Sequence, residues 1–277
     1  MHRCIDGFVA KIGKESQERP NGVNMVEWFD MSSFDLFGEM AFGETFGCVA
    51  SDFFTHISEK VKSGEVPLEE MTAHASTLII AGGETTATTL AAAMFYLLKD
   101  PRVTRKLTEE IRSSFTSYEQ ITASAAQQLP YLQAVINEAL RIHPSGAHGF
   151  PRISPGLNVD GNWVPRGSEI YTCTWVASHN PDYFENPDEF RPERWTDPNC
   201  KDVKEASQPF SLGFRACIGR NFAYMQMSLV LSKMLYTYDL ELVEKNMDWE
   251  AESKHYIMWM KAPYHVRAHP RSSRVVS

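Results

Sequence analysis

The pattern of apolar and polar positions predicts that the first 142 residues are almost all helical. The segment 131–142 shows the clearest stripe, formed by Leu132, Val135, Ile136, Ala139 and Leu140. Between 28 and 47, apolar side chains cover more than one side, so we expect that helix to pack on several neighbours. We predict helices over residues 6–14, 28–47, 51–62, 67–98, 103–115 and 131–142.

The longest predicted helix lies between two prolines. Pro67 stands where a first helical residue belongs, and Glu69 and Glu70 follow it with charges that suit the positive end of the helix dipole. Pro101 disfavours helical backbone in the residue before it, so the helix is expected to stop at 99–101.

The stretch 73–98 is the most apolar part of the chain, but it contains His74, Glu84 and several threonines. A charged residue is costly at the centre of a bilayer, so this stretch predicts a buried helix rather than a transmembrane segment. The first ten residues carry no long apolar run, so no signal peptide or anchor is expected there. As written, the chain is expected to be soluble.

The pattern changes after residue 149. Proline, glycine and β-forming residues fill 149–176, with Asp160-Gly161 as a hairpin turn and 169–176 as the best strand. The stretch 180–201 is predicted to be a long loop, either ordered or disordered. A last helix is predicted from 219 to 236, followed by a terminal β-hairpin over 256–266. The predicted fold class is mainly α with a small β region (α+β).

The 277-residue chain has a formal charge of −8 at pH 7 and a pI near 5.6. This acidic balance argues against a generally basic surface, so nucleic acid is not an expected partner. The five cysteines are widely spaced without a C-x-x-C pair, which argues against a zinc ribbon and favours free thiols. No repeat, low-complexity tract or linker divides the sequence, so we expect a single domain over 1–277.

The segment 210–219, FSLGFRACIG, runs directly into the last predicted helix. A thiolate at Cys217 would be stabilised by the helix N-terminus and by the charges of Arg215 and Arg220. Gly213 and Gly219 would let the backbone turn tightly and approach a flat ligand closely. Taken alone, Cys217 is explained as well by a buried structural thiol.

The spacing F-x-x-G-x-R-x-C-x-G resembles the haem-thiolate loop of the cytochrome P450 family, in which the cysteine is the axial ligand of the haem iron. The resemblance implies heme b bound through the Cys217 thiolate. It also implies that Phe210, Gly213, Arg215 and Gly219 belong to the haem site, with Arg215 on a propionate and Phe210 shielding the proximal side.

Two further residues follow from the same resemblance. Arg152 stands where many relatives place a second propionate-binding arginine. His148 is a weaker candidate for the haem site, and its alternative is a solvated loop histidine.

The segment 81–86, AGGETT, places two glycines in the middle of the longest predicted helix, where each costs about 1 kcal/mol relative to alanine. One explanation is a close crossing with another helix. The resemblance offers a second, because A-G-x-[DE]-T-T passes over the distal haem face in the family. It implies that Glu84 and Thr85 help to deliver protons for oxygen activation.

Glu138 and Arg141 stand three residues apart on the 131–142 helix, away from its apolar stripe. By themselves they predict an exposed ion pair that stabilises the helix by about 0.2–0.5 kcal/mol. The family's E-x-x-R pair is instead buried and locked by a later arginine. The resemblance assigns that role to Arg194 in the segment 190–195, FRPERW, as part of a structural triad that supports the proximal side and orders the long loop.

The resemblance covers about residues 24–266 and implies a partial cytochrome P450 fold. Family members carry a membrane anchor and further helices at the N-terminus, usually at the endoplasmic reticulum. The chain is expected to lack these, and the connection 49–66 is too short for the pair of helices that roofs the substrate pocket. The texture of 177–195 most resembles filamentous-fungal members of secondary metabolism.

Two functions remain open at this point. The first is a haem-thiolate monooxygenase that takes electrons from NADPH–cytochrome P450 reductase and inserts one oxygen atom from O2 into a lipophilic small molecule. The second is a truncated, catalytically inactive P450-like protein with weak or no haem binding. The motifs favour the first function, and the expected gaps favour the second.

Overall fold

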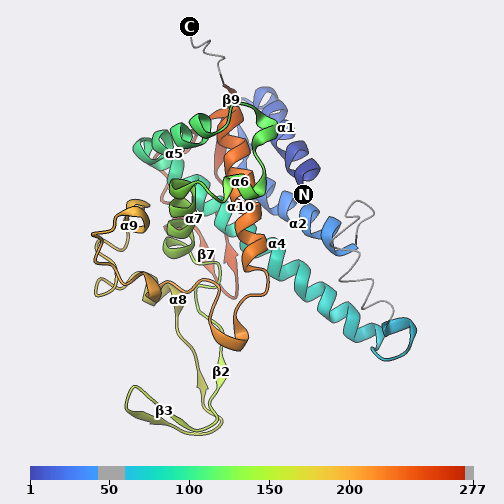
Figure 1. Ribbon diagram of the computed structural model, residues 1–277, viewed down its shortest axis with the longest axis vertical. Coiled ribbons are helices and arrows are strands. Elements are labelled where there is room, and N and C mark those ends of the chain that lie inside the picture. The colour runs from blue at the N-terminus through green and yellow to red at the C-terminus, as the bar shows by residue number, and fades with distance from the viewer. Residues whose placement is uncertain (43–59, 272–277) are drawn as a thin grey trace.

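The computed structural model of the protein describes residues 1–42 and 60–271 (Figure 1). Two predictions fall partly outside this range, namely the end of the 28–47 helix and most of the 51–62 helix. Helices predominate and the strands form small sheets, so the predicted mainly α class is confirmed.

Helices account for most of the described chain. They are α1 (His2–Glu18), α2 (Met25–Phe42), α4 (Leu68–Lys99), α5 (Pro101–Ser114), α6 (Ala123–Ala126), α7 (Pro130–Ile142), α8 (Thr174–Ser178), α9 (Glu193–Thr196), α10 (Arg220–Thr237) and α11 (Trp249–Glu252). The strands are β1 (Val23–Asn24), β2 (Arg152–Ile153), β3 (Leu157–Val159), β4 (Asn162–Val164), β5 (Glu169–Ile170), β6 (Tyr238–Leu242), β7 (Lys254–His255), β8 (Trp259–Met260) and β9 (His265–Pro270).

The junction between α4 and α5 shows how local chemistry sets the helix ends. Asp100 accepts hydrogen bonds from the backbone N–H groups of Arg102 (2.8 Å) and Val103 (3.2 Å), so it caps α5. Pro101 is the first residue of α5, a position that needs no N–H donor. The predicted stop at 99–101 is correct. Pro67, however, precedes α4 as its extended cap residue rather than opening the helix.

The core lies where α4, α7 and α10 pack against one another, with α1 and α5 on the outside. Only the second half of α4 takes part: its residues from Thr86 to Leu97 are mostly buried, whereas Leu68 is 66% and Ile80 57% exposed. In Figure 1 the first half of α4, in cyan, extends away from the other helices. The prediction of a buried helix is therefore wrong for most of this half, in which few residues besides Ala75 and Gly83 are buried.

Helix α4 is also the one helix, among the residues placed by the structure, that is long and apolar enough to cross a membrane. Buried residues make up 61% of its most apolar window, as in the core helix of a water-soluble fold.

A three-stranded antiparallel sheet, in the order β1-β9-β6, joins distant parts of the chain. Val23 pairs with Val266, and Leu242 pairs with the same residue from the other side. The predicted hairpin over 256–266 is wrong in this respect. Its first part pairs within the short β7–β8 ladder, while its end begins β9 of the sheet.

The β-rich region between α7 and α8 was predicted in part. Asp160 and Gly161 adopt positive φ angles of 48° and 78° between β3 and β4, as the hairpin turn requires. The strand predicted over 169–176 is wrong beyond Ile170, because 174–178 forms helix α8. Backbone contacts to the preceding loop override the β propensity, since Trp175 N–H donates to the Ala147 carbonyl at 2.9 Å.

Candidate functional site

The Cys217 loop, defined here as residues 210–219, turns tightly before α10. Ser211 and Gly213 both have positive φ, at 57° and 64°, and the backbone N–H of Cys217 donates to the Phe210 carbonyl at 2.8 Å. Gly219 precedes the first residue of α10, and a Cβ built on it would lie 3.8 Å from Cys217 Sγ. The loop thus presents the thiol at the N-terminus of a long helix, where the dipole favours an anion.

Cys217 is an exposed, free thiol rather than the buried structural thiol that was the alternative. Its neighbours in sequence are exposed as well, although they are apolar: Phe214 is fully exposed and Ile218 is 88% exposed. The guanidinium of Arg215 makes no hydrogen bond or ion pair with any residue in the described ranges. An accessible thiol, an apolar surface and a free cation together fit an apolar ring system with acidic substituents, as haem is.

The loop is held to the core by its first residue. The Phe210 ring packs on Tyr224 of α10 with ring centroids 5.4 Å apart, and the guanidinium of Arg220 lies 5.8 Å from the Phe210 ring. Tyr224 in turn donates to Asn137 of α7 at 2.6 Å. Phe210 therefore links the loop to the two helices behind it.

The two weaker haem-site candidates, Arg152 and His148, have local partners of their own. Arg152 begins β2 and donates to the carbonyls of Phe150 (3.2 Å) and Pro151 (2.9 Å), without a carboxylate partner. His148 is exposed, and its ring lies 4.9 Å from that of His255. Within the described residues, no hydrogen bond or ion pair joins either of them to the Cys217 loop.

Glu84 and Thr85 have separate partners on α4. The Thr85 hydroxyl donates to the Ala81 carbonyl of its own helix at 2.5 Å. Glu84 instead accepts from the ammonium of Lys261 at 2.6 Å. The structure thus does not join the two residues that the motif associates with proton delivery. Lys261 could not be foreseen, because it stands in a different part of the sequence.

The two glycines of the motif lie at the crossing of α2 and α4, but only Gly82 is in tight contact there. A Cβ on Gly82 would lie 1.8 Å from Cζ of Phe37, and one on Gly83 would lie 3.4 Å from Phe34. Gly82 is therefore required by the packing of Phe37, whereas Gly83 has room for a methyl group. The helix-crossing explanation accounts for the first glycine directly.

The charged residues Glu138, Arg141 and Arg194 meet in the interior, with no exposed side-chain surface on any of them. Arg141 donates to both carboxylate oxygens of Glu138, at 2.8 and 3.0 Å. Arg194 Nε donates to the same carboxylate at 3.0 Å. The pair is thus a buried network and not an exposed ion pair.

Further partners saturate this network. The indole of Trp195 donates to Glu138 Oε2 at 2.8 Å, and the backbone N–H of Arg191 donates to Oε1 at 2.9 Å. Asp202 pairs with Arg194, and the pKa of Asp202 is lowered because hydrogen bonds from the Glu185 backbone and Arg194 outweigh its burial. The motif did not point to Asp202. These contacts order the 180–201 loop, one of the two outcomes left open.

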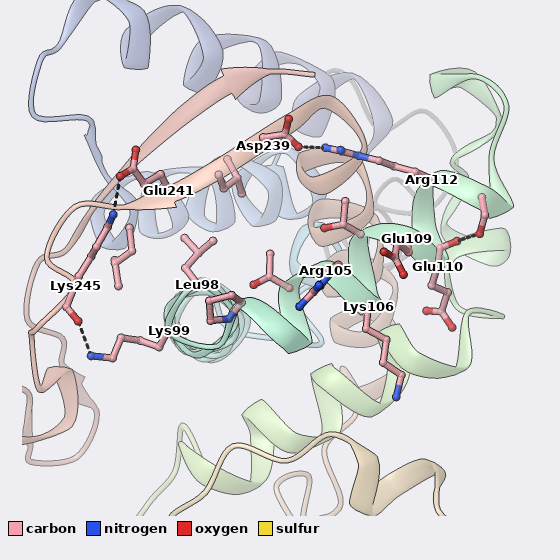
Figure 2. A pocket seen from close by; sticks show the side chains of 16 residues that line it. Leu98, Lys99, Arg105, Lys106, Glu109, Glu110, Arg112, Asp239, Glu241 and Lys245 are labelled. Carbon is pink, nitrogen blue, oxygen red and sulfur yellow. Dashed lines mark hydrogen bonds and ion pairs between the residues drawn. The ribbon is translucent and has the colours of Figure 1, made fainter. Parts of the chain in front are cut away.

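A groove of about 1230 Å³ runs between α5, the end of α4 and β6, and none of the candidate residues lines it (Figure 2). Two ion pairs lie along it, Arg112–Asp239 at 2.8 Å and Lys245–Glu241 at 2.9 Å. These paired charges on an open surface form no catalytic arrangement.

Comparison with known proteins gives one consistent result. A cytochrome P450 family model matches residues 50–268. The chain is 44% identical over 335 residues to "Cytochrome P450 monooxygenase ORF9" of Penicillium roqueforti, covering 97% of this chain and 66% of that protein. It is 39% identical to "Cytochrome P450 monooxygenase BOT4" of Botryotinia fuckeliana, covering 97% of this chain and 64% of the relative.

A third relative, "Cytochrome P450 monooxygenase aclL" of Aspergillus oryzae, is 32% identical, covering 98% of this chain and 70% of the relative. The chain thus spans about two thirds of the length of these proteins. The first alignment extends over 335 positions although this chain has 277 residues, so dozens of the relative's residues inside the matched region have no counterpart here. Together with the matched family model, these identities show that the chain belongs to the cytochrome P450 family.

Proposed function

We propose that the protein is a haem-thiolate monooxygenase that binds heme b through Cys217 and inserts one oxygen atom from O2 into a lipophilic small molecule. The observation that carries the proposal is the exposed thiol at the start of α10, set among exposed apolar side chains and beside a free arginine. The fungal relatives named as monooxygenases support the same assignment, as does the family's use of haem.

A bound haem supplies the redox chemistry that activates dioxygen, and the thiolate ligand favours O–O cleavage. The chain's own residues bind and orient the group. Cys217 would supply the thiolate that holds the iron, and Arg215 and Arg152 would supply cations for the propionates, since guanidinium–carboxylate hydrogen bonds are strong and directional. Phe210, which packs on Tyr224, would shield the thiolate from solvent. Gly213 and Gly219 keep the loop backbone free of side-chain bulk.

Proton handling on the other side is assigned to α4. Glu84 supplies an acidic proton carrier and Thr85 a hydroxyl that can pass a proton on. The hydroxyl is fixed by the Ala81 carbonyl, and the carbonyl of Thr85 accepts from Ser145 at 2.9 Å. These bonds hold the backbone around Thr85 in one position, which proton transfer over hydrogen-bond distances requires.

A lipophilic substrate is supported by the surroundings of Thr85. Ser145, in the loop after α7, bonds to the Thr85 carbonyl, and the indole of Trp259 donates to the Pro144 carbonyl at 2.9 Å. The loop and the β7–β8 turn therefore lie next to this part of α4. They carry exposed apolar side chains, including Phe150 at 61% and Ile257 at 85%. Electrons would come from NADPH–cytochrome P450 reductase, as is general for such monooxygenases.

The truncated, catalytically inactive P450-like protein is the second candidate. It is favoured by the exposed first half of α4 and by the relative's residues without a counterpart. An open site admits water to the reacting centre and does not hold a substrate. Under this alternative the purified chain contains haem far below one equivalent and forms no product with NADPH and a reductase.

The carbon monoxide spectrum of the reduced protein tests the primary proposal. The parent chain reconstituted with haem is expected to show the red-shifted Soret band of a thiolate-ligated iron. Cys217→Ser is expected to abolish that band. Cys200→Ser is the matched control, because it removes a half-buried free thiol outside the loop and should leave the spectrum unchanged. A red-shifted band that survives Cys217→Ser would refute the assignment.

A further inference from the structure

Lys261 brings one ammonium group to two carboxylates from different helices. Its side chain is only 3% exposed, and its Nζ lies 2.6 Å from Glu84 Oε1 and 2.9 Å from Asp30 Oδ1. Lys261 belongs to the connection between β8 and β9, whereas Asp30 lies on α2 and Glu84 on α4. Thr88, one turn after Glu84, lies 3.3 Å from the same ammonium. Three separate segments thus enclose a single buried charge.

The two carboxylates share this ammonium. Lys261 Nζ donates to Glu84 Oε1 and forms an ion pair with Asp30 Oδ1 at the same time. Burial raises the pKa of Asp30, and the nearby charges of Glu84 and Glu27 add to this, while the hydrogen bond and charge of Lys261 oppose it. Asp30 is therefore a second carboxylate that already contacts the ammonium.

A carboxylate that is held by an ammonium cannot donate or receive a proton at another site until it turns away. Separation of the Glu84–Lys261 pair would ordinarily leave a buried ammonium without a partner, which is strongly unfavourable. Here Asp30 stands close enough to take over. Exchange of one acid for the other keeps the charge of Lys261 paired throughout.

We propose that Lys261 is a positioning residue for Glu84, and that Asp30 is the competing carboxylate that retains the ammonium when Glu84 turns toward the oxygen-activating side of α4. This inference rests on the proposed monooxygenase function. Lys261 itself touches neither haem nor substrate in this assignment. Its effect passes through Glu84, whose orientation it sets.

The experiment follows where reducing equivalents go in haem-loaded protein supplied with NADPH and reductase. In Lys261→Met the fraction of electrons recovered as hydrogen peroxide is expected to change by about threefold or more, because proton delivery is no longer directed. Lys261→Arg keeps the charge and should restore the parent value. Asp30→Asn removes the competitor, so Glu84 stays paired and oxygen uptake slows. Lys11→Met, on the exposed face of α1, is the control.

A second measurement needs no haem. In urea unfolding, Lys261→Met should lower the midpoint less in a Glu84→Gln background than in the parent, since the partner is already gone. Additive midpoints would show that the two side chains are not coupled in solution, and the proposal would then be wrong. If Lys261→Met does not fold, Asp30→Asn is measured in its place, because it removes one of the two carboxylates and keeps the ammonium.

The outcomes separate this inference from the proposed function. A parent chain without the thiolate-type spectrum fails the function, and the inference falls with it. The parent chain can instead show that spectrum while its peroxide fraction and pH profile match those of Lys261→Met and Asp30→Asn at equal haem content. That result would contradict this inference and leave the proposed function intact. In that case the cluster would only tie three segments together.

Discussion

The triad region and the Cys217 loop use arginine in opposite ways. In the triad region every guanidinium points at a partner inside the protein, and the Glu138 carboxylate accepts from Arg141, Arg194 and Trp195. In the loop, Arg215 has no such partner among the described residues, and the apolar side chains beside it are exposed. The contrast teaches that the triad region satisfies its own charges, whereas the Cys217 loop leaves a cation and apolar side chains exposed, which is why we propose it as the ligand-binding region.

The largest effect is expected in the triad region. Glu138→Ala would leave two buried guanidinium groups without their carboxylate, which costs about 3–5 kcal/mol of unfolding free energy. Urea unfolding of the haem-free chain measures this loss, and a severe case appears as a lack of soluble protein. Glu109→Ala, on the exposed side of α5, should change stability by less than about 0.5 kcal/mol. Equal stabilities of the two variants would remove the contrast.

Acid should weaken the packing just after α7 through His143. This residue is fully buried, its ring is stacked on Trp259 and tilted against Trp249, and neither ring nitrogen has a hydrogen-bond partner among the described residues. Burial, with smaller contributions from Lys261 and two histidines, lowers the pKa of His143 from 6.5 to about 3. Because the unfolded chain binds the proton more readily, the stabilisation is complete above pH 6.5 and is lost as pH falls toward 3.

The expected loss between pH 7 and pH 4.5 is about 2–3 kcal/mol. It is measured as the difference between the parent and His143→Phe, which keeps an aromatic ring in the stack but cannot titrate. A parallel pH dependence in the two proteins would show that the imidazole is not buried as described.

A smaller effect is expected at the crossing of α2 and α4. Gly82→Ala forces the Phe37 ring to move and should cost about 1–2 kcal/mol, by analogy with overpacking in other cores. Gly83→Ala meets Phe34 at an ordinary contact distance and gains helix propensity, so it should be neutral or stabilising. Thermal unfolding of the two variants decides the matter, and a reversed order would contradict the packing explanation.

The smallest change in stability is expected in the Cys217 loop. Arg215→Ala should alter the unfolding free energy of the haem-free chain by less than about 0.5 kcal/mol, because the side chain has no partner to lose. The same variant should release haem faster than the parent, as judged by transfer to an apo-globin acceptor. Arg3→Ala, on the exposed surface of α1, serves as control for both measurements. A large loss of stability without haem would show that Arg215 already has a structural role.

Local chemistry made much of the fold predictable. Helical periodicity located α7 to within one residue of Pro130, and turn chemistry located the β3–β4 hairpin. The errors lie where distant contacts decide. Residues 174–178 have strand-forming side chains but form α8 against the Ala147 loop, and β1 is too short to be recognised without its partner β9.

The candidate site divides in the same way. The Cys217 loop and the triad arginines follow from resemblance to short family motifs, although the residues alone predicted an exposed Glu138–Arg141 ion pair. Lys261 and Asp202 do not, because their partners Glu84 and Arg194 are recognised only once the fold brings them together. No periodicity or composition signals a single charged residue that meets another across the fold.

The sheet order β1-β9-β6 has a consequence for how the chain reaches this fold. Strand β9 lies between β1, near the start of the chain, and β6, which precedes it closely in the sequence. Val23 of β1 can therefore pair with Val266 of β9 only after Val266 has been synthesised. Contacts between residues so far apart form slowly, since a long loop has to close first. On the ribosome, Phe8 of α1 can already pack on Trp28 and Phe29 of α2, whereas the side of α1 that contacts β9 stays exposed until the last strand arrives.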